Sequence, residues 1–411
     1  MTGIPAVNEL GRVICEEVRC DLEGRFDVSD KEVRELIDER IRLKNRQCAI
    51  SLEDRLAIRK EVFSSIRGLD VLQELMDDPE VTEIMVNGMS PIFIEKRGIL
   101  INSGRAFGSA RRLTDIIQQI VAGANRTVNS SSPIVDARLP DGSRVNVVLD
   151  PVALNGPILT IRRFPKVPFD GNRLISEGSI SREALEFLGK LVKARYNLLI
   201  SGGTGAGKTT VLNILSGYIP RDERIITIED SAELTVQGID NLVSLEARNA
   251  NIEGCNAISI RDLIRTALRM RPDRIIVGEV RGSEAIDMLQ AMNVGQDGSM
   301  STIHSNGAQE ALMRLETMMM LSTTIPISSL RRQMASGIDI IVHLGRLRDG
   351  SRKVLEIREV TGCSEDGIET KTIYEFEETK GEGDRVTGCL KRVDDIENTV
   401  KLKRSGIFGA I

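Results

Sequence analysis

The sequence is poor in the residues that many binding and redox sites require. It has no tryptophan, three tyrosines and two histidines among 411 residues. Its six cysteines are scattered without a C-x-x-C pair, so neither a disulfide framework nor a Cys/His zinc site is indicated. Few aromatic side chains and a net charge of −5 also argue against a nucleic-acid channel, in which bases stack on aromatic rings within a basic groove.

Long apolar runs are also missing. No segment approaches the roughly 20 apolar residues of a membrane-spanning helix, and the N-terminus lacks a basic segment followed by a hydrophobic core. We therefore expect a cytosolic protein, or one peripheral to a membrane. The composition is otherwise ordinary, with 41% hydrophobic and 28% charged residues, and the length allows two or three domains with large cores.

The most informative segment is the glycine-rich run SGGTGAGKTT at residues 201–210. Apolar runs at 198–200 and 211–215 flank it, which predicts a strand, a loop and a helix in that order. This is the pattern of a phosphate-binding loop, whose backbone N–H groups surround a polyphosphate. Lys208 would reach the terminal phosphates and the Thr209 hydroxyl would ligate Mg²⁺. The expected cofactors are ATP and Mg²⁺, and the candidate nucleotide-binding residues are Gly202, Gly203, Thr204, Gly205, Ala206, Gly207, Lys208, Thr209 and Thr210.

Changes of pattern along the chain predict five parts. A capping box at Ser29–Glu32 and a second cap at Ser51 open two amphipathic helices, the second with Leu52, Leu56, Val62 and Ile66 on its apolar face. These helices form either a partner-docking bundle or a solubilising extension. The parts are a helical extension (1–68), a smaller mixed α/β sheet domain (69–164), a linker (165–178), a nucleotide-binding core (179–345) and a C-terminal hairpin and tail (346–411), of which the stretch from 377 onwards has only weak periodicity.

The sheet domain is predicted from short strands separated by Asn-Gly and Asp-Gly turn signals. An amphipathic helix over residues 113–121 would pack across them. The last strand carries Arg162 and Arg163 immediately before the linker. Paired arginines at a domain edge are either solvated or positioned to clamp phosphate charge. The expected strands are 83–86, 92–95, 135–139, 144–149 and 158–164.

From 181 to 344 strands alternate with helices, which predicts a mainly parallel sheet covered on both faces. Three of these strands, at 224–229, 274–280 and 300–304, end in polar residues. Because the carboxyl ends of parallel strands meet at one edge, these side chains are candidates to meet a metal-bound nucleotide. Helix-capping acids and a structural histidine are the alternatives. The polar residues are Glu229, Asp230 and Glu233, then Glu279, then His304.

Four motifs in order resemble the secretion ATPases that drive type II secretion, type IV pili and type IV secretion. They lie at 202–209, 227–233, 268–282 and 295–304. The long run LRMRPDRIIVGEVRG, with IRRF at 161–164 upstream, is most similar to the CpaF branch, the motor of Flp (tight-adherence) pili. The resemblance implies an α/β fold: a RecA-like P-loop NTPase domain preceded by a smaller PAS-like mixed α/β sheet domain and an N-terminal helical segment.

The resemblance also implies roles for matching residues. Glu233 would be the general base, Glu229 and Asp230 would hold the metal-bound water network, and Glu279 would position metal or water. Arginines of the sheet domain would cover the terminal phosphate. The implied catalytic residues are Glu233, Glu229, Glu279, Lys208, Arg144, Arg162, Arg163 and His304, and the implied metal-site residues are Thr209, Asp230 and Glu279.

One position departs from the family pattern. Residues 293–299 read NVGQDGS where the family usually has NTGHDGS, so Gln296 replaces a histidine. A glutamine can still donate and accept hydrogen bonds, but it cannot carry a positive charge. His304 is then expected to be the only histidine available to the site.

By resemblance we expect an ATP-hydrolysing homohexamer that acts on an inner-membrane platform protein, with peripheral membrane contact through its partners and no direct contact with nucleic acid. A type IV secretion or DNA-uptake motor would share every motif above. Two further alternatives stay open, a RecA-type nucleic-acid motor and a scaffold that binds nucleotide without hydrolysing it. The cluster Met318–Leu321 is expected in the core or at a subunit contact.

Overall fold

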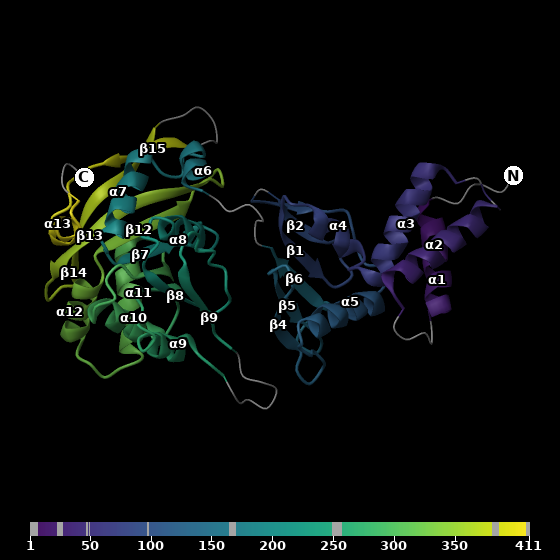
Figure 1. The fold of residues 1–411 in the computed structure, drawn as a ribbon, viewed down its shortest axis with the longest axis horizontal. Helices are drawn as coiled ribbons and strands as arrows, with labels where there is room; N and C mark the ends of the chain where they lie inside the picture. Colours follow the sequence, from purple (N-terminus) through teal and green to yellow (C-terminus); the bar gives the residue numbers. More distant parts are fainter. Residues whose placement is uncertain are drawn as a thin grey trace. The chain divides into compact units, whose positions relative to one another are not determined.

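The computed structural model describes residues 7–22, 28–46, 48, 50–96, 98–163, 170–248, 257–379 and 386–407. Contacts divide the chain into two compact units, Met1–Lys166 and Val167–Ile411 (Figure 1). The first five residues of the expected linker, 165–169, lie outside the described residues together with Phe164, and the rest of that linker contains the helix α6 (Gly171–Ser176). None of the described helices is long and apolar enough to span a lipid bilayer.

The first unit begins with three helices, α1 (Val7–Leu22), α2 (Asp30–Asn45) and α3 (Leu52–Arg67). The capping box is confirmed, since Glu32 N–H donates to Ser29 Oγ and Ser29 N–H donates to Glu32 Oε2. The apolar face expected for α3 is partly wrong. Leu56 is 57% exposed, whereas Ile58 is fully buried. At about 100° per residue Leu56 lies roughly 200° around the helix from Ile58, on the solvent side; Leu52, 67% exposed, is outside the core as well.

A six-stranded antiparallel sheet follows in the described part of this unit, in the order β3-β2-β1-β6-β5-β4. Helix α5 covers one face with the five apolar residues that the sequence pattern placed inward. The short edge strand β3 was not predicted from the sequence, and all four of its residues are exposed. The elements are α4 (Val71–Asp77), β1 (Val81–Asn87), β2 (Phe93–Lys96), β3 (Ile99–Asn102), α5 (Ala110–Gly123), β4 (Ile134–Arg138), β5 (Arg144–Val148) and β6 (Ile158–Arg162).

The second unit is built on one sheet, for which the described residues supply nine strands. Its elements are α6 (Gly171–Ser176), α7 (Arg182–Lys193), β7 (Leu198–Gly202), α8 (Lys208–Ser216), β8 (Arg224–Glu229), β9 (Asn241–Glu246), α9 (Ile260–Ala267), β10 (Arg274–Val280), α10 (Glu284–Asn293), β11 (Met300–His304), α11 (Ala308–Met320), α12 (Ile327–Gly337), β12 (Ile340–Arg346), β13 (Arg352–Cys363), β14 (Ile368–Thr379), β15 (Thr387–Arg392) and α13 (Val400–Arg404).

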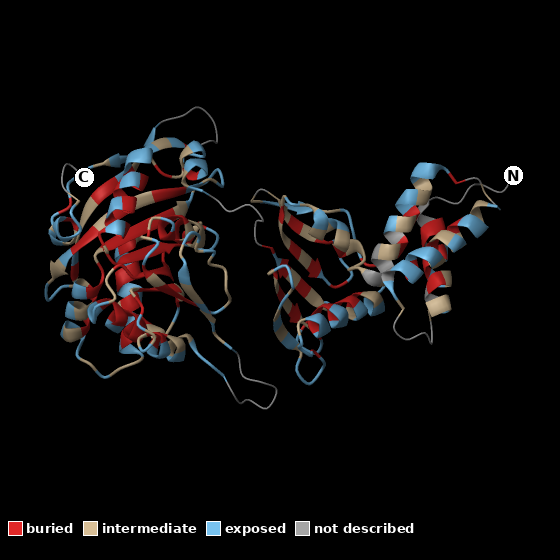
Figure 2. Cartoon of the chain, viewed as in Figure 1, coloured by how far each residue is buried: buried red, intermediate tan, exposed pale blue. Residues whose placement is uncertain are grey.

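The strands β12-β7-β11-β10-β8-β9 are parallel neighbours, as expected, and β13 to β15 continue the sheet antiparallel. Successive residues of β7 face opposite sides. Leu198 and Ile200 pack in a core with α7 and α8, and Leu199 packs in a second core with α9 to α12. Both faces are therefore covered, and Figure 2 shows buried residues concentrated in the central strands.

The sequence-based boundary at residue 345 is not a boundary of this sheet. β13 pairs with the whole length of β12. The weakly periodic stretch from 377 onwards contains the end of β14, then β15 and α13. Edge strands such as β15 and β9 bury few side chains, so their sequences carry little alternation between apolar and polar residues. The Met cluster divides: Met318 and Met319 are buried, whereas Met320 and Leu321 are exposed.

Candidate functional site

The phosphate-binding loop lies between β7 and α8, as the glycine pattern predicts. Gly205 and Gly207 have φ angles of +68° and +98°, in the left-handed region that favours glycine. At Gly202 a Cβ atom would lie 2.5 Å from the carbonyl oxygen of Leu344 on β12. The loop backbone can therefore curl over the end of β7 only because these positions carry no side chain.

Lys208 is buried at the start of α8 and connects the loop to β11. Its Nζ donates to the carbonyl oxygens of Gly202 and Gly203, each at 3.0 Å, and lies 3.2 Å from His304 Nδ1. A lysine ammonium can only donate, so Nδ1 accepts and the neutral ring carries its proton on Nε2. Burial, followed by the Lys208 charge, lowers the pKa of His304. The ring is therefore neutral near pH 7.

Glu279, on β10, lies on the other side of the His304 ring. The Nε2 and Oε1 atoms are 2.7 Å apart, but the N–H is not in line with the oxygen. Among the described residues, Glu279 Oε1 is buried without an aligned hydrogen-bond donor. Its Oε2 accepts from Arg281 at 2.9 and 2.7 Å. Arg281 also lies 3.5 Å from Asp230 Oδ2, so this arginine, which the sequence reasoning did not select, links the ends of β10 and β8.

Glu229 differs from the role that the resemblance implied. It is 4% exposed, and its Oε1 accepts the backbone N–H groups of Glu233 and Leu234 at 2.8 and 2.9 Å. A Cβ atom at Gly278 would lie 2.8 Å from Glu229 Cγ, so the neighbouring strand leaves room for this side chain. Glu229 therefore supports the segment that carries Glu233, while Asp230 is exposed. The structure does not bring these two carboxylates together around a metal.

Gln296 lies at the opposite edge of the sheet from the loop. It precedes β11, whose last residue His304 is level with Gly202 at the end of β7. The four residue steps along β11 alone span roughly 13 Å. Gln296 Oε1 is buried without a hydrogen-bond partner among the described residues. Within this unit, Gln296 therefore lies away from the residues around Lys208.

His304 is not the only histidine near the phosphate-binding loop, and its expected role in the site stays a prediction. His343, on β12, lies opposite Ser201 in the strand register. Its Nδ1 is 2.9 Å from Ser201 Oγ, at the beginning of the phosphate-binding loop. Sequence reasoning missed it because an apolar strand pattern shows that the residue is buried but not which residue it contacts.

The candidate arginines of the first unit separate into two environments. Arg163 is 8% exposed, and its guanidinium donates to the carbonyl oxygens of Asp78 and Val81. These contacts hold the guanidinium inside its own domain, and its expected role over a phosphate stays a prediction. Arg144 lies directly opposite Arg162 across β5 and β6, and Arg138, which was not predicted, lies opposite Arg144 on β4.

This row, Arg138, Arg144 and Arg162, is on the face of the sheet opposite to α5. Val145 and Ile161, the sequence neighbours of two of its members, are buried in the core that α5 covers. Because side chains alternate along a strand, the arginines point the other way.

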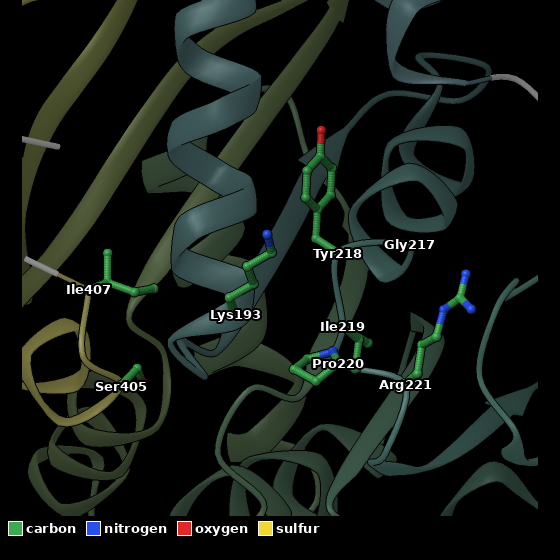
Figure 3. A pocket seen from close by; sticks show the side chains of 8 residues that line it. All are labelled: Lys193, Gly217, Tyr218, Ile219, Pro220, Arg221, Ser405 and Ile407. Carbon is green, nitrogen blue, oxygen red and sulfur yellow. The ribbon is translucent and has the colours of Figure 1, made fainter.

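A cavity of about 540 Å³ lies away from these residues. Figure 3 shows the residues around it, which include Lys193 at the end of α7, Gly217 after α8 and Ser405 after α13. It is at the end of α8 opposite to Lys208, so it belongs to none of the predicted nucleotide contacts.

With this geometry in place, residues 66–401 match the family described as type II/IV secretion system protein. The chain belongs to this family. It is 34% identical over 325 residues to a putative conjugal transfer protein of Mycobacterium tuberculosis, covering 78% of this chain and 92% of that protein. It is 33% identical over 324 residues to a type IV secretion system protein PtlH homolog of Bordetella bronchiseptica, covering 70% and 93%.

Two solved structures share the fold. The ATPase DotB of Legionella pneumophila has a TM-score of 0.50 at 24% identity, over 69% of this chain and 78% of that one. The pilus retraction motor PilT with bound ADP has a TM-score of 0.52 at 17% identity, over 82% and 87%. The expected fold and the resemblance to secretion ATPases are thereby confirmed for the family, and the CpaF branch remains a prediction.

The buried Glu229 generates a prediction about pH. Burial raises its pKa from the ordinary 4.5 to about 7, against the two backbone hydrogen bonds that favour the ionised form. The folded protein therefore holds this proton more tightly than the unfolded chain does. The resulting loss of stability begins as pH rises above about 4.5 and is complete above about 7. We expect Glu229→Gln to raise the free energy of unfolding above pH 7 by about 3 kcal/mol, at 1.36 kcal/mol per pKa unit.

Urea unfolding at pH values from 5 to 8 measures this difference. Glu375→Gln, at an exposed position of β14, is the matched control and should follow the wild type. Equal pH dependence of the wild type and Glu229→Gln would contradict the assignment.

Proposed function

We propose that this protein is an ATP-hydrolysing motor of a secretion or pilus system. The observation that carries the proposal is the continuous set of contacts from Lys208 through His304 to Glu279, at the ends of three strands of one sheet. A basic loop residue, a neutral histidine and a carboxylate in series are suited to hold and sense a terminal phosphate. Phosphoryl transfer of this kind depends mainly on positioning and on neutralising charge.

The residues at the strand ends fit a Mg²⁺ ion. Thr209 follows Lys208 in the first turn of α8, where a P-loop hydroxyl ligates this metal. Glu279 Oε1 is buried without an aligned donor among the described residues, which is an unfavourable arrangement for a carboxylate oxygen on its own. In the proposed site Thr209 and Glu279 would hold the ion, with Asp230 nearby, and the bound ion would neutralise phosphate charge.

Glu233 is the proposed general base. Its backbone N–H donates to the buried carboxylate of Glu229, so the backbone at Glu233 is fixed relative to the end of β8. A base needs to reach only one ordered water, which it deprotonates as the water attacks the terminal phosphate. In this reading Glu229 positions Glu233, and Asp230, exposed and close to Arg281, belongs to the outer part of the site.

The arginine row of the first unit is proposed to cover the terminal phosphate when the two units close. Like charges directly opposite each other across strands are destabilising. Glu83 lies opposite Arg162 at one end of the row, and the three arginines together still place more positive than negative charge on this face. An anion such as a polyphosphate is a suitable partner for it. Nucleotide state would then control the closure of the domains.

We further propose a homohexameric ring in the cytoplasm, peripheral to the inner face of the membrane, that moves an inner-membrane platform protein of Flp or related pili. The relatives named for conjugal transfer and type IV secretion equally support a type IV secretion or DNA-uptake motor. The proposal includes no direct nucleic-acid contact, and DNA-stimulated turnover would instead favour the nucleic-acid motor.

Phosphate release measured across a protein concentration series, with mass photometry on the same samples, tests the motor. We expect turnover to rise as hexamers form and to fall to background in Lys208→Ala, because the terminal phosphate loses its cation. Particles that bind ATP but release no phosphate at any concentration would identify a scaffold instead.

The base assignment gives a separate prediction. Glu233→Gln should lower turnover by at least about a hundredfold, the lower range for a lost general base, while ATP affinity changes little. Turnover and the binding of a fluorescent ATP analogue are measured together, with Glu375→Gln as the exposed control. Near-normal turnover in Glu233→Gln would transfer the role to Glu229.

The arginine row generates a prediction about Arg138, which the sequence reasoning did not select. Arg138→Gln should raise the KM for ATP and lower kcat, by about five- to tenfold if one charge-assisted hydrogen bond is lost. Arg111→Gln, at an exposed position on α5, changes the same charge on the other face and serves as the control. The same kinetics for both variants would show that the effect depends on net charge and not on the row.

A further inference from the structure

His343 is a buried histidine for which the proposed reaction has no use. It is 4% exposed and lies next to the end of β7, opposite Ser201. The pairing of β12 with β13 shifts register between His343 and Leu344. A bulge of this kind re-aims a side chain and is frequent beside active sites.

The His343 ring bridges two segments that reach the nucleotide loop from different strands. Its Nδ1 is 2.9 Å from Ser201 Oγ, and the backbone of Asn306, two residues beyond His304, is close enough to raise the pKa of the ring. Burial lowers the pKa of His343, and the Asn306 backbone opposes this by favouring the protonated ring. The neutral ring therefore turns its N–H toward Asn306, and Ser201 donates its hydroxyl proton to Nδ1.

The segment after His304 is held by a second contact beside the His343 ring. Glu356 lies opposite His343 on β13, and its Oε1 accepts the Ala308 N–H at the start of α11, at 2.9 Å. Glu356 and Glu310 are the charged groups that act on the ring. Residues 305–308, which connect His304 to α11, are thus held from β12 and β13.

We propose that His343 is a positioning residue that fixes the phosphate-binding loop relative to the segment after His304. Lys208 joins Gly202 to His304 directly. A second connection between β7 and the segment after β11 runs from Ser201 through His343 to Asn306. The bridge thereby holds Ser201 next to Gly202, whose carbonyl oxygen accepts from Lys208, and so helps to orient the ammonium for phosphate. This inference rests on the proposed nucleotide site.

Three variants test the bridge: Ser201→Ala, His343→Leu and the double variant. Each single variant should weaken the binding of a fluorescent ATP analogue with Mg²⁺ by about five- to tenfold, the value of one buried hydrogen bond. The double variant should weaken it no further, because both substitutions break the same bridge. His343→Asn, which keeps a polar atom near the Nδ1 position, should recover part of the affinity.

Ser216→Ala is the matched control, since Ser216 is a buried serine at the other end of α8 whose Oγ donates to Asn213 O. It should lower the melting temperature by a similar amount and leave the affinity unchanged. Equal affinity in wild type, Ser201→Ala and His343→Leu, with only the melting temperature lowered, would make His343 purely structural and overturn the inference. Unchanged affinity in Lys208→Ala would overturn the proposed nucleotide site itself, and the inference with it.

Discussion

The parallel pairing of β7 with both of its neighbours is the constraint on which the site depends. His304 on β11 and Leu344 on β12 are each level with Gly202 at the end of β7. Because the three strands run in the same direction and are paired in this register, the phosphate loop, a histidine and the Leu344 carbonyl that requires a glycine meet at one edge. A shift of one residue in either pairing would turn the side chains of the shifted strand to the other face of the sheet.

Burial then divides the work among carboxylates that look alike in the sequence. Glu229 is the last residue of β8 and points into the protein, where backbone N–H groups satisfy one oxygen and the surroundings raise its pKa. Asp230 comes one residue later and is exposed. Glu279 is intermediate, with one oxygen held by Arg281 and the other buried. Glu229 is therefore suited to supporting the segment that carries Glu233, and Asp230 to contacts in the outer part of the site. Glu279 is suited to metal binding.

The first unit reaches a comparable concentration of charge by antiparallel register. Arg138, Arg144 and Arg162 are spread over 25 residues of sequence, yet they stand side by side on neighbouring strands. Arg163 follows Arg162 immediately but lies in the interior, where its guanidinium binds backbone carbonyls. One step along the chain thus separates a residue suited to an anion from one that stabilises the fold.

The sequence by itself determined the phosphate loop, the strand and helix around it, and the acids at the ends of β8 and β10. These features are local, since glycine spacing and apolar runs specify them within about twenty residues. Tertiary structure decided the rest. It placed Gln296 at the far edge of the sheet, buried Arg163, brought Arg138 and Arg281 to charged neighbours, and joined His343 to Ser201 across 142 residues. Strand register and burial depend on contacts between distant segments, and the local sequence pattern does not specify those contacts.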